Sequence, residues 1–249
     1  MQVLGIDIGG SGIKGALVNT KTGELLAERH RISTPQPATP NAVAETVAAL
    51  VEHFNWQGPI GCGFPAIVLD GVVKSAANIS EKWLEVKVEK LLSKATNCKV
   101  KVVNDADAAG FAEAKFGVGK NRRGAIFLVT VGTGLGTCLV VNGKLVPNTE
   151  FGHVLLHGMI AEQYASDATR KREDLSWQEW AERFSEYLEH MCRLLSPNLI
   201  VLGGGASKKQ KKWGDYLKCG VEVVTAQLRN EAGIIGAALA AASESDTVH

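Results

Sequence analysis

Short apolar segments alternate with glycine-rich and polar turns along the chain, a pattern typical of mixed strands and helices. Residues 2–8 are apolar almost without interruption and predict a buried strand, and residues 13–19 predict a second strand after a glycine turn. The turn at 19–26 is expected to lead directly into a third strand. Residues 59–73 predict a strand, a glycine-proline elbow and another strand.

Three segments have helical patterns. Residues 40–54 place apolar side chains on one stripe, and so do residues 175–195, where Ser176 and Glu179 have the spacing of a capping box and Pro197 ends the helix. The aromatic residues of that second stripe are interpreted as helix core. Residues 231–242 predict a helix of small residues that packs closely against another element. A further helix follows the strand that ends near Val103 and is closed by Gly117.

One segment of the chain recurs. Residues 7–19 align without a gap with residues 130–142, so that Gly9 meets Gly132. A match this short arises either by chance or from duplication of a strand-turn-strand unit. Duplication predicts two related halves whose glycine turns face each other across a cleft, with a tight hairpin at Asn142-Gly143 in the second half.

Composition and charge narrow the function classes. The chain has 249 residues, with 27 Lys and Arg against 26 Asp and Glu, so no global basic field marks a nucleic-acid or membrane binder. No apolar stretch approaches roughly 18 uninterrupted residues, and no signal core follows the N-terminus. The 5 cysteines lack the spacing of zinc ligands. We therefore expect a cytoplasmic protein with reduced thiols and no structural zinc.

Three glycine turns follow apolar strands and expose backbone N–H groups that could hold phosphate oxygens. None matches the Walker sequence, and the first lacks the spacing of a dinucleotide site, which disfavours both classes. The alternative is that these glycines only turn the chain. The candidate phosphate-binding residues are Gly9, Gly10, Ser11 and Gly12 in the first turn, Gly132, Thr133 and Gly134 in the second, and Gly203, Gly204 and Gly205 in the third.

Asp7 is an acid beside the first of these turns. A carboxylate there repels phosphate unless a cation lies between them, which predicts that Asp7 serves a Mg²⁺ ion carried by the phosphates, directly or through water. The alternative is a carboxylate that caps local N–H groups. Lys14 adds a positive charge toward the transferred group or is a solvated strand residue.

Polar residues at a strand end suggest the acceptor chemistry. Asp105 follows Asn104 where a parallel sheet presents its ligands, and a carboxylate there could accept a hydroxyl proton in phosphoryl transfer. Asp107 is interpreted as complementing the helix dipole. A further group has the hydrogen-bonding capacity to hold sugar hydroxyls, although its histidine could be purely structural: Glu150, His153 and Glu162.

Together these segments resemble the ROK family of sugar kinases and repressors. The motifs are "DIGGSGIKG", "GFPA", "NDADAAG", "TVGTGLG", "EFGH" and "LIVLGGGAS", and they span nearly the whole chain. Two departures stand out. The cysteine cluster that most of the family carries after the Gly-His pair is absent, which is similar to the polyphosphate glucokinase branch. Ala66 stands where relatives usually have glycine, within the element expected to form the hinge.

The resemblance implies an α/β protein with the actin-like ATPase (ribonuclease H-like) fold, two α/β domains around a central cleft. Residues 1–105 with 232–249 would form the smaller domain and 106–231 the larger. It implies that Asp105 is the base on the sugar 6-hydroxyl, that Asn104, Glu150, His153, Glu162 and Asn78 hold the sugar, and that Asp7 serves the metal. Expected partners are glucose, inorganic polyphosphate or ATP, Mg²⁺ and a second copy of the chain, with no nucleic acid and no membrane.

The two remaining enzyme alternatives differ in the phosphoryl donor that they use. Polyphosphate is a repeating anion and calls for a basic track, which Lys120, Arg122, Arg123, 170–172 and 208–212 could supply, unless these runs are only solvated surface. An ATP-dependent glucokinase of the same family is the alternative enzyme. A sugar-sensing repressor would need an N-terminal winged helix, for which a strand starting at Gln2 leaves no room, and a purely structural actin-like protein would not need the acceptor residues.

Overall fold

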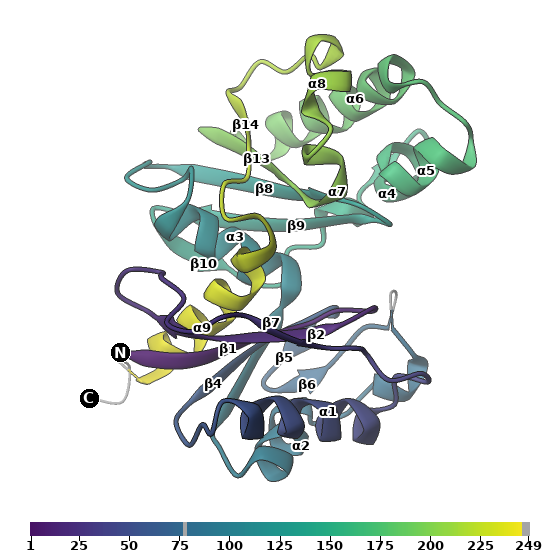
Figure 1. Ribbon diagram of the computed structural model, residues 1–249. Helices are drawn as coiled ribbons and strands as arrows, with labels where there is room; N and C mark the ends of the chain where they lie inside the picture. Colours follow the sequence, from purple (N-terminus) through teal and green to yellow (C-terminus); the bar gives the residue numbers. More distant parts are fainter. Residues whose placement is uncertain (77–78, 246–249) are drawn as a thin grey trace. The chain divides into compact units, whose positions relative to one another are not determined.

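The computed structural model describes residues 1–76 and 79–245. The chain divides into two compact units, Met1–Ala112 with Asn230–His249, and Glu113–Arg229. Each unit contains a mixed β-sheet flanked by helices (Figure 1). In the described ranges no helix is both long enough and apolar enough to cross a membrane.

The sheet of the first unit has the strand order β3-β2-β1-β4-β7. β1 and β2 are antiparallel, as are β2 and β3, whereas β1, β4 and β7 run parallel. The strand predicted at 2–8 is therefore central, which explains its nearly continuous apolar sequence. The elements are β1 (Gln2–Ile8), β2 (Ile13–Asn19), β3 (His30–Ile32), α1 (Pro40–His53), β4 (Ile60–Phe64), β5 (Val68–Leu69), β6 (Val72–Val73), η1 (Glu81–Trp83), α2 (Val88–Thr96), β7 (Val100–Asn104), the start of α3 (Asp105–Phe116) and α9 (Ala232–Ser245).

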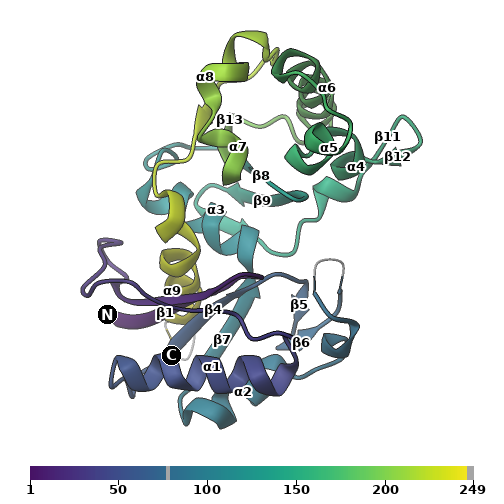
Figure 2. The same ribbon diagram turned by 45° about the vertical axis from the view of Figure 1, so that its right-hand side comes forward.

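Helix α9 covers one face of this sheet, and α1 and α2 cover the other (Figures 1 and 2). The small residues of α9 let it approach the strands closely, as predicted. A Cβ on Gly5 would lie 2.1 Å from the carbonyl oxygen of Ile234, and one on Gly61 would lie 1.8 Å from that of Ala237. Backbone therefore packs on backbone here, and only glycine fits at these two strand positions.

The third strand differs from the prediction. Leu25 forms only an isolated bridge to Val18, and the regular strand β3 begins at His30. The intervening residues form a bend instead of continuing the hairpin. The regular strand has only three residues, too few for an apolar period to mark its start in the sequence.

The sheet of the second unit has the order β10-β9-β8-β13-β14, with the same pattern of antiparallel and parallel pairs. The predicted helix at 175–195 is α6, which begins after the predicted capping box and packs its aromatic side chains into the core. The elements are β8 (Ala125–Val131), β9 (Leu135–Val141), β10 (Lys144–Val146), η2 (Phe151–His153), β11 (Leu155–Leu156), β12 (Met159–Ile160), α4 (Ala161–Ala165), α5 (Asp167–Arg172), α6 (Trp177–Leu195), β13 (Leu199–Gly203), α7 (Gly204–Ser207), α8 (Gln210–Trp213), η3 (Gly214–Tyr216), β14 (Val223–Thr225) and η4 (Arg229–Glu231), the last at the boundary with the first unit.

The shared topology confirms the predicted repeat. In the first unit Ile8 pairs with Ile13, and in the second Val131 pairs with Leu135. The burial patterns of the two hairpins are nearly identical, strand by strand. The second turn is one residue shorter, however, so Leu135 and not Gly136 is the structural equivalent of Ile13. The gapless alignment is correct for the first strand and one residue off for the second.

Candidate active site

The first glycine turn joins β1 to β2 and is held by two donors from the segment around β3. Thr34 Oγ1 donates to Gly9 O at 2.5 Å, and Arg31 Nη2 donates to Ser11 O at 2.5 Å. Within the turn Gly9 N donates to Gly12 O at 3.2 Å. Among the described residues the N–H groups of Gly10, Ser11 and Gly12 have no acceptor. The turn therefore presents unused backbone donors, as a phosphate site requires.

Asp7 pairs across the hairpin with Lys14, and Lys14 Nζ lies 3.2 Å from Asp7 Oδ2. Both side chains are largely buried, 21% exposed for Asp7 and 26% for Lys14. Within the described residues no backbone N–H donates to the Asp7 carboxylate, so the capping alternative is wrong. The first turn of α9 leaves space for this carboxylate, because the residue that faces it is Gly233.

Asn104 and Asp105 lie at the junction of β7 and α3, as predicted. Asn104 is buried, and its Oδ1 accepts from the N–H groups of Ala106 and Asp107, so its side chain caps α3. Its Nδ2 donates to Ala66 O at 3.4 Å. Asn104 thus has a structural role that sequence reasoning missed, and its contact with a sugar stays a prediction.

Asp7 and Asp105 flank the same glycine. Asp7 is the register partner of Gly63 on β4, and a Cβ on Gly63 would lie 3.7 Å from the Asp105 Cα. Asp107 lies in the first turn of α3 and is only 1% exposed, a position that fits the predicted interaction with the helix dipole. The predicted sugar-binding residue Asn78 lies outside the described residues.

The second and third glycine turns lie together in the second unit. Gly204 forms a bridge to Val131 at the end of β8, and a Cβ on Gly204 would lie 2.5 Å from Val131 O. Its φ of +78° also favours glycine. Gly132 N donates to Gly134 O at 3.1 Å, and Gly132 O accepts from Ala168 N at the start of α5. The turns that carry Thr133 and Gly203 are thus adjacent.

The predicted sugar-binding group of this unit is brought together. His153 Nε2 lies 3.5 Å from Glu162 Oε1, and His153 Nδ1 lies 3.9 Å from Glu150 Oε2. Burial raises the pKa of the Glu150 carboxyl above its ordinary value, His153 opposes this shift, and the negative charge of Glu162 adds to it. Two carboxylates and one imidazole can supply both acceptors and a donor to sugar hydroxyls.

Glu162 also connects this group to the second glycine turn. Its Oε2 accepts from Leu135 N at 3.4 Å, and a Cβ on Gly134 would lie 2.3 Å from that oxygen. The carboxylate therefore occupies the space that any side chain at Gly134 would take. No sequence pattern indicated this contact between Gly134 and Glu162, and the role of Gly134 in phosphate binding stays a prediction.

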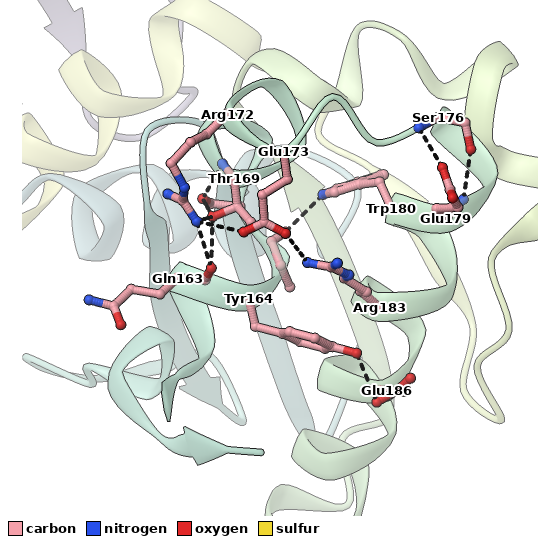
Figure 3. A network of polar contacts seen from close by, with 12 residues as sticks. Gln163, Tyr164, Thr169, Arg172, Glu173, Ser176, Glu179, Trp180, Arg183 and Glu186 are labelled. Carbon is pink, nitrogen blue, oxygen red and sulfur yellow. Dashed lines mark hydrogen bonds and ion pairs between the residues drawn. The ribbon is translucent and has the colours of Figure 1, made fainter. Parts of the chain in front are cut away.

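A polar network holds the helix that carries Glu162 (Figure 3). Tyr164 donates to Glu186 on α6 at 3.3 Å, and Thr169 on α5 donates to Gln163 O at 2.9 Å. Arg183 on α6 reaches Glu173 at 2.7 Å, just after α5. These contacts tie α4, α5 and α6 together and so fix the backbone position from which Glu162 reaches the turn.

Part of the predicted basic track, Arg122 and residues 170–172, is neutralised by neighbouring acids. Arg122 makes a bidentate pair with Glu222 at 3.0 and 3.1 Å. Asp167 lies 2.9 Å from Arg170 and 2.7 Å from Lys171; burial of this carboxyl acts to raise its pKa, but the two cations outweigh it and lower the pKa. These pairs favour the surface alternative for Arg122 and for residues 170–172.

Cys192 and Cys219, far apart in sequence, are close in the structure. Their Sγ atoms lie 3.7 Å apart, and burial together with Cys219 raises the pKa of Cys192 to about 11. All the cysteines are free thiols. In residues 1–76 and 79–245 no group of three or more His, Cys, Asp or Glu side chains is placed to hold a metal ion by itself. The expectation of no structural zinc stays a prediction.

Solved structures define the class of protein. The inorganic polyphosphate/ATP-glucomannokinase of Arthrobacter sp. strain KM superimposes with a TM-score of 0.92 and 45% identity, covering 98% of this chain and 99% of that one. A ROK family glucokinase of Streptomyces griseus, solved with glucose and AMPPNP, has a TM-score of 0.79 at 24% identity over 98% of this chain and 100% of its own, which supports the fold alone. The chain has the actin-like ATPase fold of these sugar kinases.

The family follows from sequence. The ROK family model matches residues 3–167. The polyphosphate glucokinase of Mycobacterium tuberculosis is 44% identical over 246 residues, which cover 98% of this chain and 92% of that protein. The polyphosphate glucokinase of Mycobacterium leprae is likewise 44% identical, covering 98% of this chain and 75% of its own. The chain belongs to the ROK family.

Proposed function

We propose that this protein is a polyphosphate glucokinase, which transfers a terminal phosphoryl group from inorganic polyphosphate to the 6-hydroxyl of glucose. The observation that carries the proposal is the 44% identity to polyphosphate glucokinases over 98% of the chain. The grouping of Glu150, His153 and Glu162 beside a glycine turn supports it from the acceptor side. ATP is a second donor in this proposal, since a similar structure is a polyphosphate/ATP enzyme.

In the proposed reaction Asp105 is the general base. Its carboxylate accepts the proton of the sugar 6-hydroxyl as that oxygen bonds to the terminal phosphorus, and the bond from phosphorus to the bridging oxygen of the donor breaks. Asn104, Glu150, His153 and Glu162 hold the other hydroxyls. The part-buried carboxylates among them accept hydrogen bonds, which orients the sugar and lowers the entropic cost of the reactive geometry.

In the proposal, backbone N–H groups hold the phosphoryl donor. The N–H groups of Gly10, Ser11 and Gly12 bind phosphate oxygens, with Gly9 and Lys14 at the sides of the same hairpin, and the second unit contributes Thr133, Gly134, Gly203 and Gly204. This division assigns the base and one phosphate turn to the first unit, and the sugar ligands and two phosphate turns to the second.

The residues present also fit a magnesium ion. Mg²⁺ in phosphoryl transfer is usually bound by one or two carboxylates, several waters and the phosphates themselves. Asp7 supplies one such carboxylate beside the phosphate turn, directly or through water. When bound, the ion neutralises charge on the phosphates. Lys14, which now pairs with Asp7, holds that carboxylate in place on the hairpin.

A coupled assay tests the proposal. Purified protein with glucose and Mg²⁺ is supplied with either polyphosphate or ATP, and glucose 6-phosphate is detected with its dehydrogenase. We expect turnover with polyphosphate. Turnover with ATP alone would establish the alternative, an ATP-dependent glucokinase, and glucose binding without turnover by either donor would favour a sugar sensor. A cytoplasmic homodimer is part of the proposal, and sedimentation of the purified chain tests its dimeric part.

A further inference from the structure

Arg31 is the cation at the first phosphate turn that sequence reasoning missed. It lies on β3, and the sheet register sets it opposite Lys14, which is itself opposite Asp7. Register partners on neighbouring strands point to the same face, so an acid and two bases form a row across three strands. The row begins next to the turn and therefore borders the N–H groups of Gly10, Ser11 and Gly12, which have no acceptor among the described residues.

The three charged residues of this row do not contribute equally to its net charge. Asp7 and Lys14 form an ion pair at 3.2 Å and largely cancel each other. Arg31 has no acidic partner among the described residues. The net positive charge of the row is therefore located on the exposed guanidinium of Arg31. Without it, the first phosphate turn would have backbone dipoles but no uncompensated cation.

The guanidinium is seated on the turn rather than free in solvent. Its Nη2 donates to Ser11 O at 2.5 Å, and a Cβ on Gly12 would lie only 2.4 Å from its Nε. This contact draws the Ser11 carbonyl toward Arg31. The remaining N–H donors of a guanidinium form a planar fork that matches phosphate oxygens. The fork thus lies beside the turn, where a second phosphate would follow the first.

We propose that Arg31 binds a non-transferred phosphate of the donor, next to the phosphate held by the N–H groups of the first turn, so that the site recognises a chain of phosphates rather than one phosphate. This inference rests on the proposed function and names a residue of its donor site. The ligand class is a linear oligophosphate anion, whether inorganic or the phosphate chain of a nucleotide.

Binding of unreactive probes tests the inference without turnover. Wild type and Arg31→Gln are titrated by calorimetry with inorganic tripolyphosphate and, separately, with orthophosphate. Loss of a charge-assisted contact of about 1.5–3 kcal/mol corresponds to roughly 10-fold or more weaker tripolyphosphate binding. Orthophosphate binding should change less than about 2-fold, since the turn alone holds a single phosphate. Arg31→Lys should recover part of the tripolyphosphate affinity.

Salt dependence supplies a second reading. The slope of the logarithm of tripolyphosphate affinity against the logarithm of salt should decrease by about one for Arg31→Gln, as expected when one phosphate contact is lost. Arg29→Gln is the matched control, because it removes the same charge two residues away without touching the turn, and it should match wild type in both readings.

Two results would overturn the inference. One is unchanged tripolyphosphate affinity in Arg31→Gln. The other is equal weakening of both probes with an unchanged salt slope, which would make Arg31 only a brace for Ser11. The proposed function fails separately, when the wild-type protein shows no turnover with either donor. In that case a selective loss of tripolyphosphate binding would still support the role of Arg31.

Discussion

The two units share one sheet topology and differ in what braces their glycine turns. In the first unit Arg31 and Thr34 donate to turn carbonyls. In the second an acid, Glu162, accepts from the residue after the turn, and the N–H of Ala168 donates to Gly132 O. The position of the Asp7–Lys14 ion pair is taken in the second unit by Thr130 and Gly136, where a hydroxyl donates to a carbonyl at 3.3 Å.

The two units thus share a backbone geometry but differ in the side chains that lie beside their glycine turns. The repeated strand-turn-strand unit supplies similar backbone cradles, and beside the first lie the Asp7–Lys14 ion pair and Arg31, which has no acidic partner among the described residues. The second turn is bordered by the Glu150, His153 and Glu162 group instead. The first turn thus has charged groups suited to phosphate and metal, whereas the second turn also contacts a group suited to sugar hydroxyls. Changes at Arg31 should therefore affect the donor, and changes at Glu162 should affect glucose.

The largest expected effect comes from Asp105, which tests whether the first unit holds the base. Asp105→Asn should lower kcat by at least about 10²-fold, because a positioned base typically contributes that much. The KM for glucose should stay close to that of wild type, since the hydroxyl ligands of the second unit are unchanged. Steady-state kinetics with the coupled assay give both values.

Asp70→Asn is the control for this variant. Asp70 is an exposed acid of the same unit in the left-handed region, with φ of +49°, which asparagine also adopts. It should keep full turnover. If Asp105→Asn turned over at a near-normal rate, Asp105 would not be the base.

Paired glycine substitutions test the comparison directly. A Cβ on Gly134 would displace Glu162, and one on Gly12 would displace Arg31, in each case by pushing the end of a flexible side chain rather than backbone. Gly134→Ala should raise the KM for glucose roughly 10-fold, as expected when contacts to a charged group are lost. Gly12→Ala should raise the KM for polyphosphate by a similar factor. Gly12→Ala should leave the KM for glucose nearly unchanged.

The controls for these variants concern stability. A Cβ on Gly132 would have no neighbour within 4 Å. Gly132→Ala should therefore unfold at the same temperature as wild type, and Gly12→Ala and Gly134→Ala should lie close to it in differential scanning calorimetry. The comparison between units would be wrong if Gly134→Ala left the KM for glucose unchanged and Gly12→Ala raised it.

The raised pKa of Glu150 predicts a pH dependence of glucose binding, which we assign to the second unit. Below the raised pKa the carboxyl is protonated and no longer accepts two hydrogen bonds, so the KM for glucose should rise a few-fold as the pH falls, starting above the ordinary glutamate value of 4.5. The effect of pH on folding stability is the reverse of its effect on glucose binding. The stabilising contribution of Glu150 is fully present below its ordinary pKa and is lost as the pH rises through the raised pKa of the folded state.

Kinetics at a series of pH values check this prediction. Glu150→Gln should have a higher KM for glucose throughout and a flatter profile, whereas the exposed Glu45→Gln of the first unit should follow wild type. A profile for Glu150→Gln that still rose with acidity would assign the titration to another group.

Sequence reasoning predicted those features that depend on local patterns. The strands, the capping box at Ser176, the junction at Asn104 and the repeated hairpin all follow from apolar periodicity and turn residues. The start of β3 was wrong because its three residues are too few to give a period. The one-residue difference between the two turns was missed because the second strands are largely apolar, so that an alignment shifted by one residue still matches most apolar residues with apolar ones.

The remaining features depend on contacts between distant residues. Nothing in the sequence around Arg31 marks it as a partner of Ser11, and Gly134 is indistinguishable from any turn glycine until Glu162 is placed beside it. Likewise Arg122 and residues 170–172 were predicted to belong to a basic track. Their acidic partners could not be assigned from the sequence, because these contacts become clear only once the chain is folded. Side-chain partners, not elements, were therefore the least predictable part.

The smallest expected effect compares the helix caps of the two units. In α6, Ser176 Oγ accepts from Glu179 N at 3.2 Å and Ser176 N donates to Glu179 Oε2 at 2.9 Å, whereas in α1 the Thr39 side chain accepts one longer bond of 3.4 Å from Ala42 N. Ser176→Ala should cost about 1 kcal/mol of unfolding free energy. Thr39→Ala should cost less, because its bond is longer and Pro40 already fixes the first helical φ. Urea unfolding of both variants measures this difference, and an equal or larger loss for Thr39→Ala would show that the reciprocal bonds of the capping box add nothing to α6.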